Sequence, residues 1–203
     1  MAANRRGRPV EVDPDRVARL ALRLFVERGF DAVTMDDIAQ AAQVSRRSLF
    51  RLFSTKSTLL WEGLPEAVEE FGQALADQPP ETDAFVAVRE AVTGSLLWAS
   101  PDIEITRARL RLIGAHSALF AEVIPRFERG QRQIAAFLAE RRPDLAGLVA
   151  TVAASAITAT VFTALTWWAE HDDGPPQPVV DRALRAVEEG FSPQRSRSSV
   201  PRT

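Results

Sequence analysis

An all-α fold is predicted by three features of this 203-residue sequence. Apolar residues recur at three- and four-residue spacing through most of the chain, which is typical of amphipathic helices. Residues that favour helix N-termini precede these segments, and short proline-containing breaks separate them. No alternation of polar and apolar residues indicates a strand.

Residues 1–12 form a basic arm that contains glycine and proline, and the first helix follows it. Asp13 is a typical N-cap, Pro14 suits the first helical position, and Gly29 is a typical stop signal. Between them the apolar residues at helical spacing are Val17, Leu20, Ala21, Leu24 and Phe25.

Two further short helices follow, each with its own N-cap. Thr34, with Asp37 three residues later, predicts a capped helix over residues 35–41. After a tight turn, Ser45 caps a helix that runs to about Leu52. Three short helices within about 45 residues predict a helix-turn-helix module.

The rest of the chain predicts longer helices, separated by the breaks DQPP, SPD and RRPD. The expected ranges are 56–76, 82–99, 103–114, 117–141, 145–170 and 178–190. Pro125 is expected to kink the helix over 117–141 or to mark its true start. We therefore expect a helix-turn-helix domain at 13–60, a larger helical domain at 61–191 and a disordered tail at 192–203.

The residue inventory argues against an enzyme. There is no cysteine and no tyrosine, and the two histidines, His116 and His171, lie far apart in the sequence. No glycine-rich phosphate loop or paired metal-binding histidines occur either. We therefore expect no catalytic site, no metal site and no cofactor.

One uncharged stretch is a candidate for a membrane span. Residues 145–169 contain no charge, and 25 residues are long enough to cross a bilayer. Alanine and threonine dilute the stretch and no polybasic flank follows it, which favours a helix buried against its own domain and a partner. A membrane-associated helical protein remains the alternative. The N-terminus lacks an apolar signal segment, so we expect a cytoplasmic protein without a membrane partner.

Charge is distributed unevenly along the chain. Residues 1–60 carry 11 arginines and lysines against 7 acidic residues, whereas the remainder carries 14 against 20. A basic N-terminal third on an acidic body is typical of a protein whose one end meets a polyanion.

The segment VSRRSLFRLFSTK concentrates this charge on one helical face. On a helical wheel Leu49, Leu52 and Phe53 share one side, and Arg47 and Arg51 share the other. The paired arginines at its start lie in the first turn, where the helix dipole disfavours positive charge. Because the segment contains no acidic residue, we expect an external anion. A merely solvated basic face is the alternative.

From about Asp15 to Leu60 the chain resembles the DNA-binding domain of the TetR family of bacterial regulators. The matching positions are Phe25, Gly29, Phe30, Thr34, Ile38, Ala39, Val44, Ser45, Phe53 and Lys56. The resemblance implies a homodimer that places one recognition helix per subunit in successive major grooves of a near-palindromic operator. Repression is the family's default.

The resemblance also assigns roles to individual residues. It places Arg46, Arg47 and Ser48, with the N-cap Ser45, at base edges or nearby phosphates. The residues expected along the DNA backbone are Thr34, Phe50, Arg51 and Lys56. From their charge alone, Arg5, Arg6 and Arg8 are expected to reach the minor groove.

Three departures from the family pattern stand out. Phe50 replaces a tyrosine that bonds a phosphate, and Leu52 replaces a frequent His or Tyr. Gln43 replaces the usual turn glycine, which costs about 1 kcal/mol if the turn needs a left-handed residue.

The C-terminal body is expected to dimerise through 145–170 and 178–190 and to bind a small-molecule effector. The candidate pocket residues are Trp98, Leu112, His116, Phe120, Phe127, Phe162 and Trp167, each of which also suits an ordinary core position. Arg107 and Arg111 share a helical face and suit an anionic ligand, or else pair with Glu104 and solvent.

The stretch from residue 105 to 142 resembles the ligand-binding domain of TetR-like regulators that take acyl-CoA-like ligands and are linked to mycofactocin-type redox or lipid metabolism. The resemblance implies an apolar channel for an acyl chain and arginines for the CoA phosphates. A drug-like aromatic ligand on the same fold is the alternative.

Overall fold

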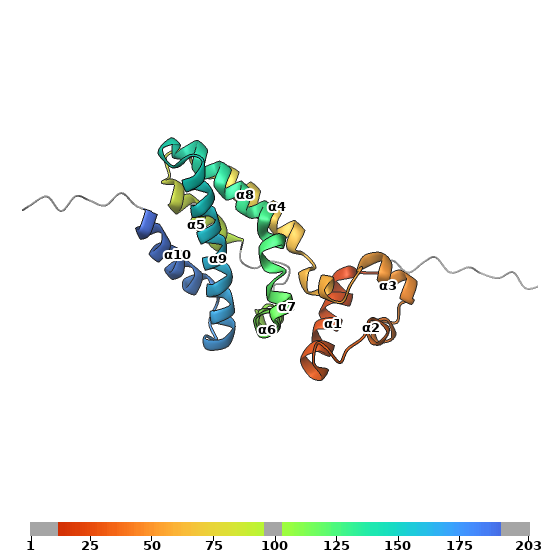
Figure 1. Ribbon diagram of the computed structural model, residues 1–203. Helices are drawn as coiled ribbons and strands as arrows, with labels where there is room; N and C mark the ends of the chain where they lie inside the picture. Colours follow the sequence, from red (N-terminus) through yellow and green to blue (C-terminus); the bar gives the residue numbers. More distant parts are fainter. Residues whose placement is uncertain (1–11, 96–102, 192–203) are drawn as a thin grey trace, which may run out of the picture. The chain divides into compact units, whose positions relative to one another are not determined.

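The computed structural model describes residues 12–95 and 103–191, and within those ranges every regular element is a helix (Figure 1). The predicted all-α class is therefore confirmed. The predicted tail, Trp98 and the arm residues Arg5, Arg6 and Arg8 lie outside the described residues. The chain divides into two compact units, one formed by residues 1–67 and 97–120 and the other by residues 68–96 and 121–203.

The first unit begins with the three short helices predicted from capping residues. They are α1 (Pro14–Arg28), α2 (Met35–Ala42) and α3 (Arg46–Leu52). Asp13 accepts the Arg16 backbone N–H at 3.3 Å, and Gly29 ends α1 with a φ of 88°. The side chains that pack the three helices together are Val17, Ala21, Phe25, Ile38, Leu49 and Phe53.

The helix predicted over residues 56–76 is interrupted. A 3₁₀ helix, η1 (Ser57–Trp61), precedes α4 (Leu64–Ala76), and Gly63 lies between them with a φ of 80°. An L-residue helix cannot continue through that conformation, which explains why the prediction of one continuous helix was wrong.

Two more helices complete the first unit: α6 (Ile103–Ala115) and α7 (Ser117–Phe120). Helix α6 packs against α1, as does η1. Leu110 and Ile113 of α6 are fully buried, which anchors this helix.

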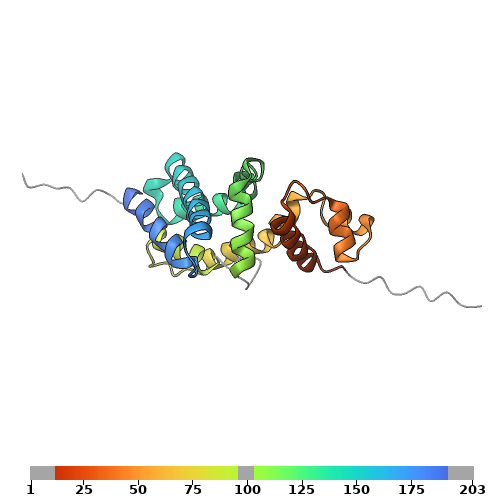
Figure 2. The ribbon, with the colours of Figure 1, turned by 90° about the horizontal axis from the view of Figure 1, so that it is seen from below.

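The second unit contains most of α4 together with α5 (Ala84–Gly94), α8 (Val123–Arg141), η2 (Pro143–Leu145), α9 (Leu148–His171) and α10 (Gln177–Phe191). Helix α9 lies between α8 and α10, and α5 packs on α10 and α8 (Figure 2). The Trp168 indole donates to the Gly174 carbonyl oxygen at 2.8 Å and fixes the α9–α10 turn.

Two expected helix boundaries differ from those observed. The helix predicted over residues 117–141 splits into α7 and α8, and Pro125 lies in the first turn of α8, where its missing N–H costs little. The helix predicted over 145–170 begins only after Gly147, whose φ of 78° separates η2 from α9.

Candidate nucleic-acid interface and effector-binding residues

Helix α3 presents one face to the core of the first unit and the opposite face to solvent. Leu49 and Phe53 are 0% and 2% exposed. Arg47 and Arg51 are both exposed, four residues apart on one side of the helix, and Phe50 is 41% exposed. The predicted separation of a packed face and an arginine face is therefore confirmed, although Leu52 is only half-buried.

The start of α3 is fixed by two serines. The Ser45 side-chain oxygen accepts the Ser48 backbone N–H at 3.0 Å, and the two hydroxyl oxygens lie 2.8 Å apart. This cap orients the first turn and engages both side chains. Their expected contact with DNA stays a prediction.

Arg46 has an anionic neighbour within the protein. Its Nε lies 3.1 Å from Oδ1 of Asp36 in the first turn of α2, and its guanidinium carbon lies 5.6 Å from the centre of the Phe50 ring. Arg46 therefore has an ion-pair partner inside the protein, and its expected contact with an external anion stays a prediction. The sequence could not reveal Asp36, because the partner comes from a different helix.

The turn between α2 and α3 adopts the strained conformation that the sequence suggested. Gln43 has φ 57° and ψ 38°, and within the described residues no other non-glycine residue has a positive φ. Its N–H bonds to the Ala39 and Gln40 carbonyls, and the Val44 N–H reaches the Ala39 carbonyl at 3.0 Å. A left-handed residue is thus what ends α2 and redirects the chain into α3.

Thr34 and Asp37 form a reciprocal cap at the start of α2. The Asp37 carboxylate accepts the Thr34 backbone N–H at 2.8 Å, and the Asp37 N–H donates to the Thr34 hydroxyl at 3.2 Å. The hydrogen bonds from Thr34 hold the pKa of Asp37 below its ordinary value. The Thr34 side chain also serves this cap, and its expected phosphate contact stays a prediction.

Lys56, also expected along the DNA backbone, is directed toward the loop between α1 and α2. Its ammonium donates to the carbonyls of Phe30 and Val33, the latter at 2.9 Å, and lies 4.2 Å from the centre of the Phe30 ring. A phosphate contact would have to compete with these bonds. The structure therefore gives Lys56 a clear role in holding the loop.

The three alternating arginines of α6 have different surroundings. Arg107 and Arg109 are 2% and 3% exposed, whereas Arg111 is exposed. The Arg107 Nε lies 3.5 Å from a carboxylate oxygen of Glu104, as one of the two sequence readings expected. Although Arg107 and Arg111 share a helical face, only Arg107 is buried.

Arg109 was not among the candidate ligand-binding residues, yet its pKa departs strongly from the ordinary value of arginine. Burial lowers the pKa of Arg109 to about 10, and the carboxylates of Asp15 and Glu62 act against that decrease. Burial in turn raises the pKa of Glu62, with Asp15 and Glu66 adding to the increase and Arg109 opposing it. Arg109 thus brings positive charge from α6 to an acidic group around α1 and η1.

The remaining candidates of the first unit differ in their burial and their neighbours. His116 at the end of α6 contacts Phe30, with ring centres 5.5 Å apart, and its Nδ1 lies 2.8 Å from the Leu112 carbonyl oxygen. Leu112 is half-buried and Phe120 is 50% exposed. The contact with Phe30 supports the alternative reading of His116 as a packed residue at a helix end.

In the second unit, two of the candidate aromatic residues meet and one does not. Phe127 of α8 and Phe162 of α9 have ring centres 6.4 Å apart. Trp167 is 44% exposed and stacks on His171 with ring centres 4.8 Å apart, so it lies at the surface of this unit, and its expected ligand contact stays a prediction. The buried tryptophan is its neighbour Trp168, because α9 turns that position toward the core.

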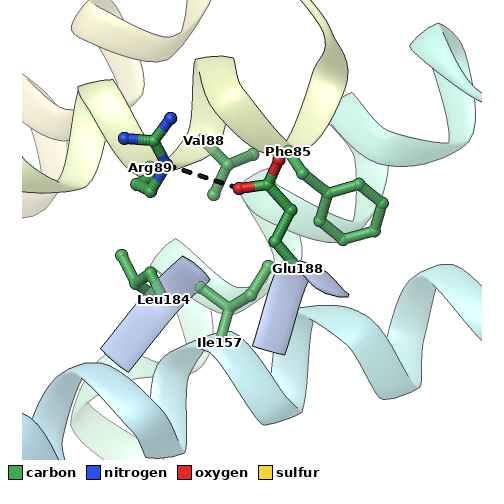
Figure 3. A pocket seen from close by; sticks show the side chains of 6 residues that line it. All are labelled: Phe85, Val88, Arg89, Ile157, Leu184 and Glu188. Carbon is green, nitrogen blue, oxygen red and sulfur yellow. Dashed lines mark hydrogen bonds and ion pairs between the residues drawn. The ribbon is translucent and has the colours of Figure 1, made fainter. Parts of the chain in front are cut away.

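A small recess in the second unit lies among α5, α9 and α10. It is lined by Phe85, Val88, Arg89, Ile157, Leu184 and Glu188, and its open space of about 210 Å³ includes solvent (Figure 3). Ligand pockets typically measure about 300–1,000 Å³, so this recess is too small for an acyl-CoA. Arg89 ion-pairs across it with Glu188 at 3.4 Å and with Asp181 at 2.5 Å, which makes it a structural contact between α5 and α10.

Helix α9 combines a buried face with an uncharged exposed one. Leu148 and Val152 are 77% and 49% exposed, and Ala159 is also exposed farther along the helix. By length and composition α9 could cross a membrane, but 44% of its most apolar window is buried inside the protein. Length and composition suit both a membrane span and a core helix. Helix α9 packs on α8 and α10, as a core helix of a folded unit does.

Within residues 12–95 and 103–191, no three histidine, aspartate or glutamate side chains form a cluster that could hold a metal ion. The residues that stand out chemically are therefore the arginines of α3 and α6.

Comparison with known families gives two matches. Residues 19–62 match the bacterial regulatory proteins of the tetR family, and residues 82–192 match the MftR C-terminal domain. The chain is also 30% identical over 142 residues to the mycofactocin biosynthesis transcriptional regulator MftR of Mycobacterium tuberculosis. That alignment covers 68% of this chain and 70% of the relative.

Solved structures of regulators have a similar fold. FadR of Thermus thermophilus, a TetR-family repressor in complex with lauroyl-CoA, aligns with a TM-score of 0.60 and 21% identity, over 93% of this chain and all of FadR. SmeT, the repressor of a Stenotrophomonas maltophilia multidrug efflux pump, aligns with a TM-score of 0.62 and 20% identity, over 95% of this chain and 97% of SmeT. SmeT has also been solved with triclosan. At these identities the likeness concerns the fold alone.

Proposed function

Because the chain belongs to the TetR family of bacterial regulatory proteins and has an MftR-type C-terminal domain, we propose that it is a homodimeric repressor that releases its operator when a hydrophobic or acyl-CoA-like effector binds. It is a ligand-responsive, DNA-binding transcriptional regulator and not an enzyme. Repression, the dimer surface and the effector class are the proposed parts. We also propose that it acts in the cytoplasm, where operator DNA is accessible.

The observation that carries the DNA-binding surface is the two-sided character of α3. Leu49 and Phe53 fix the helix to the core, so Arg47 and Arg51 are presented outward from a rigid support. Arginine suits this position because its planar guanidinium donates two parallel hydrogen bonds to guanine O6 and N7, or to a phosphate. We assign base contact to Arg47 and backbone contact to Arg51.

Arg47→Ala tests this assignment. Duplexes selected by the wild-type protein from a random pool supply the operator, and fluorescence anisotropy measures affinity for it and for its single-base variants. We expect a loss of about 1–3 kcal/mol with relaxed specificity at one position. Arg23→Ala, which removes an exposed arginine from α1, controls for overall charge. Unchanged operator affinity for Arg47→Ala would rule out base contact by this residue.

For the dimer, we propose the exposed uncharged face of α9 together with α10, in the expected ranges 145–170 and 178–190. A monomer would leave Leu148 and Val152 in water, and pairing with a second copy removes that apolar surface. A closed two-fold dimer also matches a near-palindromic operator.

Ala159→Glu places a charge in the centre of this face, and Ala136→Glu on the exposed side of α8 is the matched control. Light scattering after size exclusion should give about twice the chain mass of 22.3 kDa for the wild type and the control, and the single-chain mass for Ala159→Glu. A dimer in all three proteins would place the interface elsewhere. Wild-type protein that sediments with membranes would favour the membrane alternative.

For the effector, three observations support an acyl-CoA-like compound. The C-terminal domain is of MftR type, and Phe127 and Phe162 supply an apolar ring pair within the second unit. Separately, α6 of the first unit buries a guanidinium at Arg107. A CoA thioester combines anionic phosphates with an apolar chain, which is the chemistry that arginine and phenylalanine recognise. The structural likeness to FadR suggests lauroyl-CoA as the first probe.

Thermal unfolding in the presence of lauroyl-CoA, free CoA, lauric acid or triclosan distinguishes the ligand classes. A ligand at one hundred times its Kd stabilises the folded state by about 2.7 kcal/mol. We expect the largest shift with lauroyl-CoA and a smaller one with Arg107→Met or Phe162→Ala. A shift with triclosan alone would favour the drug-like alternative, and no shift with lauroyl-CoA would overturn the acyl-CoA proposal.

A further inference from the structure

We propose that Asp36 of α2 positions Arg46 of α3 to read a guanine, so that base specificity is set jointly by both helices of the helix-turn-helix motif. This inference rests on the proposed operator contact of α3. In it Asp36 is a positioning residue, which acts on DNA through Arg46 and not by touching the base itself.

The geometry holds the Arg46 side chain from two directions. The Asp36 carboxylate lies 3.1 Å from the Arg46 Nε, and the Phe50 ring lies on the same guanidinium with its centre 5.6 Å from the central carbon. Phe50 follows Arg46 by four residues, so both lie on one face of α3. A carboxylate from one helix and a ring from the other therefore fix the side chain.

This pair is poorly explained by stability alone. The Arg46 and Asp36 side chains are 68% and 61% exposed, and ion pairs this accessible to water contribute little to folding. The pair also lies beside the exposed arginines of α3 and not in the core of the unit. Its effect is therefore expected on the conformation of Arg46 at the surface where DNA is proposed to bind.

The chemistry leaves Arg46 able to bind a base while it is held. A guanidinium has five N–H donors, and Asp36 lies beside the one on Nε. The donors on the two terminal nitrogens form the flat fork that matches guanine O6 and N7. A free arginine loses much rotamer freedom when it binds, whereas a side chain already held loses less.

Asp36 also introduces a cost that gives the proposal its distinctive signature. A carboxylate beside the DNA-binding arginines repels phosphates of any sequence. Removing Asp36 should therefore tighten binding to unrelated DNA while it weakens discrimination at one base pair. A charge that acted only through repulsion would change the affinity for all sequences by the same factor.

The experiment compares the wild type with Asp36→Ala, Asp36→Asn, Arg46→Ala and the double variant Asp36→Ala/Arg46→Ala. Asp31→Ala is the matched control, because Asp31 is an exposed carboxylate in the α1–α2 loop of the same unit. Anisotropy titrations use the duplex that the wild type selects from a random pool, every single-base-pair substitution of it, and an unrelated duplex of equal length. Thermal unfolding of each variant verifies that the fold is kept.

We expect Arg46→Ala to lose about 5- to 150-fold discrimination at one G·C pair, the range of a single bidentate contact. Asp36→Ala should lose about 2- to 12-fold at the same pair, as expected for freeing one long side chain, while its affinity for the unrelated duplex rises. The double variant should discriminate no worse than Arg46→Ala. Asp31→Ala should leave discrimination intact.

Two results would overturn the inference. If Asp36→Ala and Asp36→Asn both discriminate between base pairs as well as the wild type does, Asp36 acts only through its charge. If the Arg46→Ala protein does so, Arg46 reads no base. Failure of the proposed function would give a different result in the same titrations. In that case the wild-type protein itself would bind its selected duplex no better than the unrelated one.

Discussion

Replacing Gln43 by glycine is expected to stabilise the protein, because the backbone conformation of Gln43 is strained and its side chain makes little compensating contact. At φ 57° and ψ 38° the residue is in the left-handed helical region, which costs an L-residue about 1–2 kcal/mol. Its side chain is exposed, so little packing is lost with it. Glycine adds about 0.4–1 kcal/mol of unfolded-state entropy, which leaves a net gain of about 0.5–1 kcal/mol.

Urea unfolding of a small set of variants at this turn measures the gain. Gln43→Ala keeps the left-handed penalty and isolates the loss of the side chain, so it should bring no gain. Gln43→Asn should fall between Ala and Gly, because asparagine tolerates this region. Gln40→Gly, one turn earlier inside α2, should instead cost about 1 kcal/mol. A Gly variant no more stable than the Ala variant would refute the argument from backbone strain.

Three other substitutions test single contacts of the first unit. Arg109→Met relieves the cost of burying a guanidinium, but it also removes the charge that opposes the raised pKa of Glu62, so the variant should be less stable relative to the wild type at pH 7 than at pH 4. Without Arg109 the pKa of Glu62 rises further, so the Glu62 carboxylate of the folded variant is protonated toward pH 4 and the stability difference from the wild type shrinks there. Urea titrations that give an equal difference at pH 7 and pH 4 would contradict this. Lys56→Met should cost about 2 kcal/mol of unfolding free energy through its bonds to the Phe30 loop. Unchanged stability with a shallower salt dependence of DNA binding would instead assign Lys56 to a phosphate. Phe50→Tyr should tighten operator and unrelated DNA alike by about 0.5–1.5 kcal/mol in anisotropy titrations, and no gain would contradict a place for residue 50 beside the backbone.

The parts of the fold that depend on neighbours in the sequence were predictable. Capping at Asp13, Thr34 and Ser45 uses side chains and N–H groups no more than three residues apart, and the sequence placed the starts of α1, α2 and α3 correctly. The family's usual glycine at position 43 raised a left-handed turn as a condition, and the structure shows that Gln43 adopts this conformation.

Breaks at single glycines were missed for a related reason. Gly63 and Gly147 lie between apolar segments whose spacing continues on both sides, so the pattern predicts an unbroken helix. Glycine is compatible with a helix interior and with a positive φ, and tertiary packing decides between them. The pattern alone carries no signal for that decision.

Contacts between helices were the least accessible to sequence reasoning. Arg109 was not among the candidate residues, yet the packing of α6 against α1 brings it near Asp15 and Glu62. Helical periodicity determines which residues share a face, but not which helix meets that face. The register between two helices depends on side-chain packing across the unit, which is a property of the fold as a whole.

Phe50 shows how a departure from the family pattern changes meaning once that register is known. In the sequence it counts as a lost phosphate contact, because phenylalanine has no hydroxyl. In the structure its ring lies against Arg46 while Asp36 approaches the same guanidinium from α2. These two neighbours offset the unfavourable interaction of Arg46 with the positive end of the α3 dipole. Arg47, for which neither neighbour is available, keeps its charge directed at solvent, and the two arginines of the pair are therefore expected to differ in how they bind DNA.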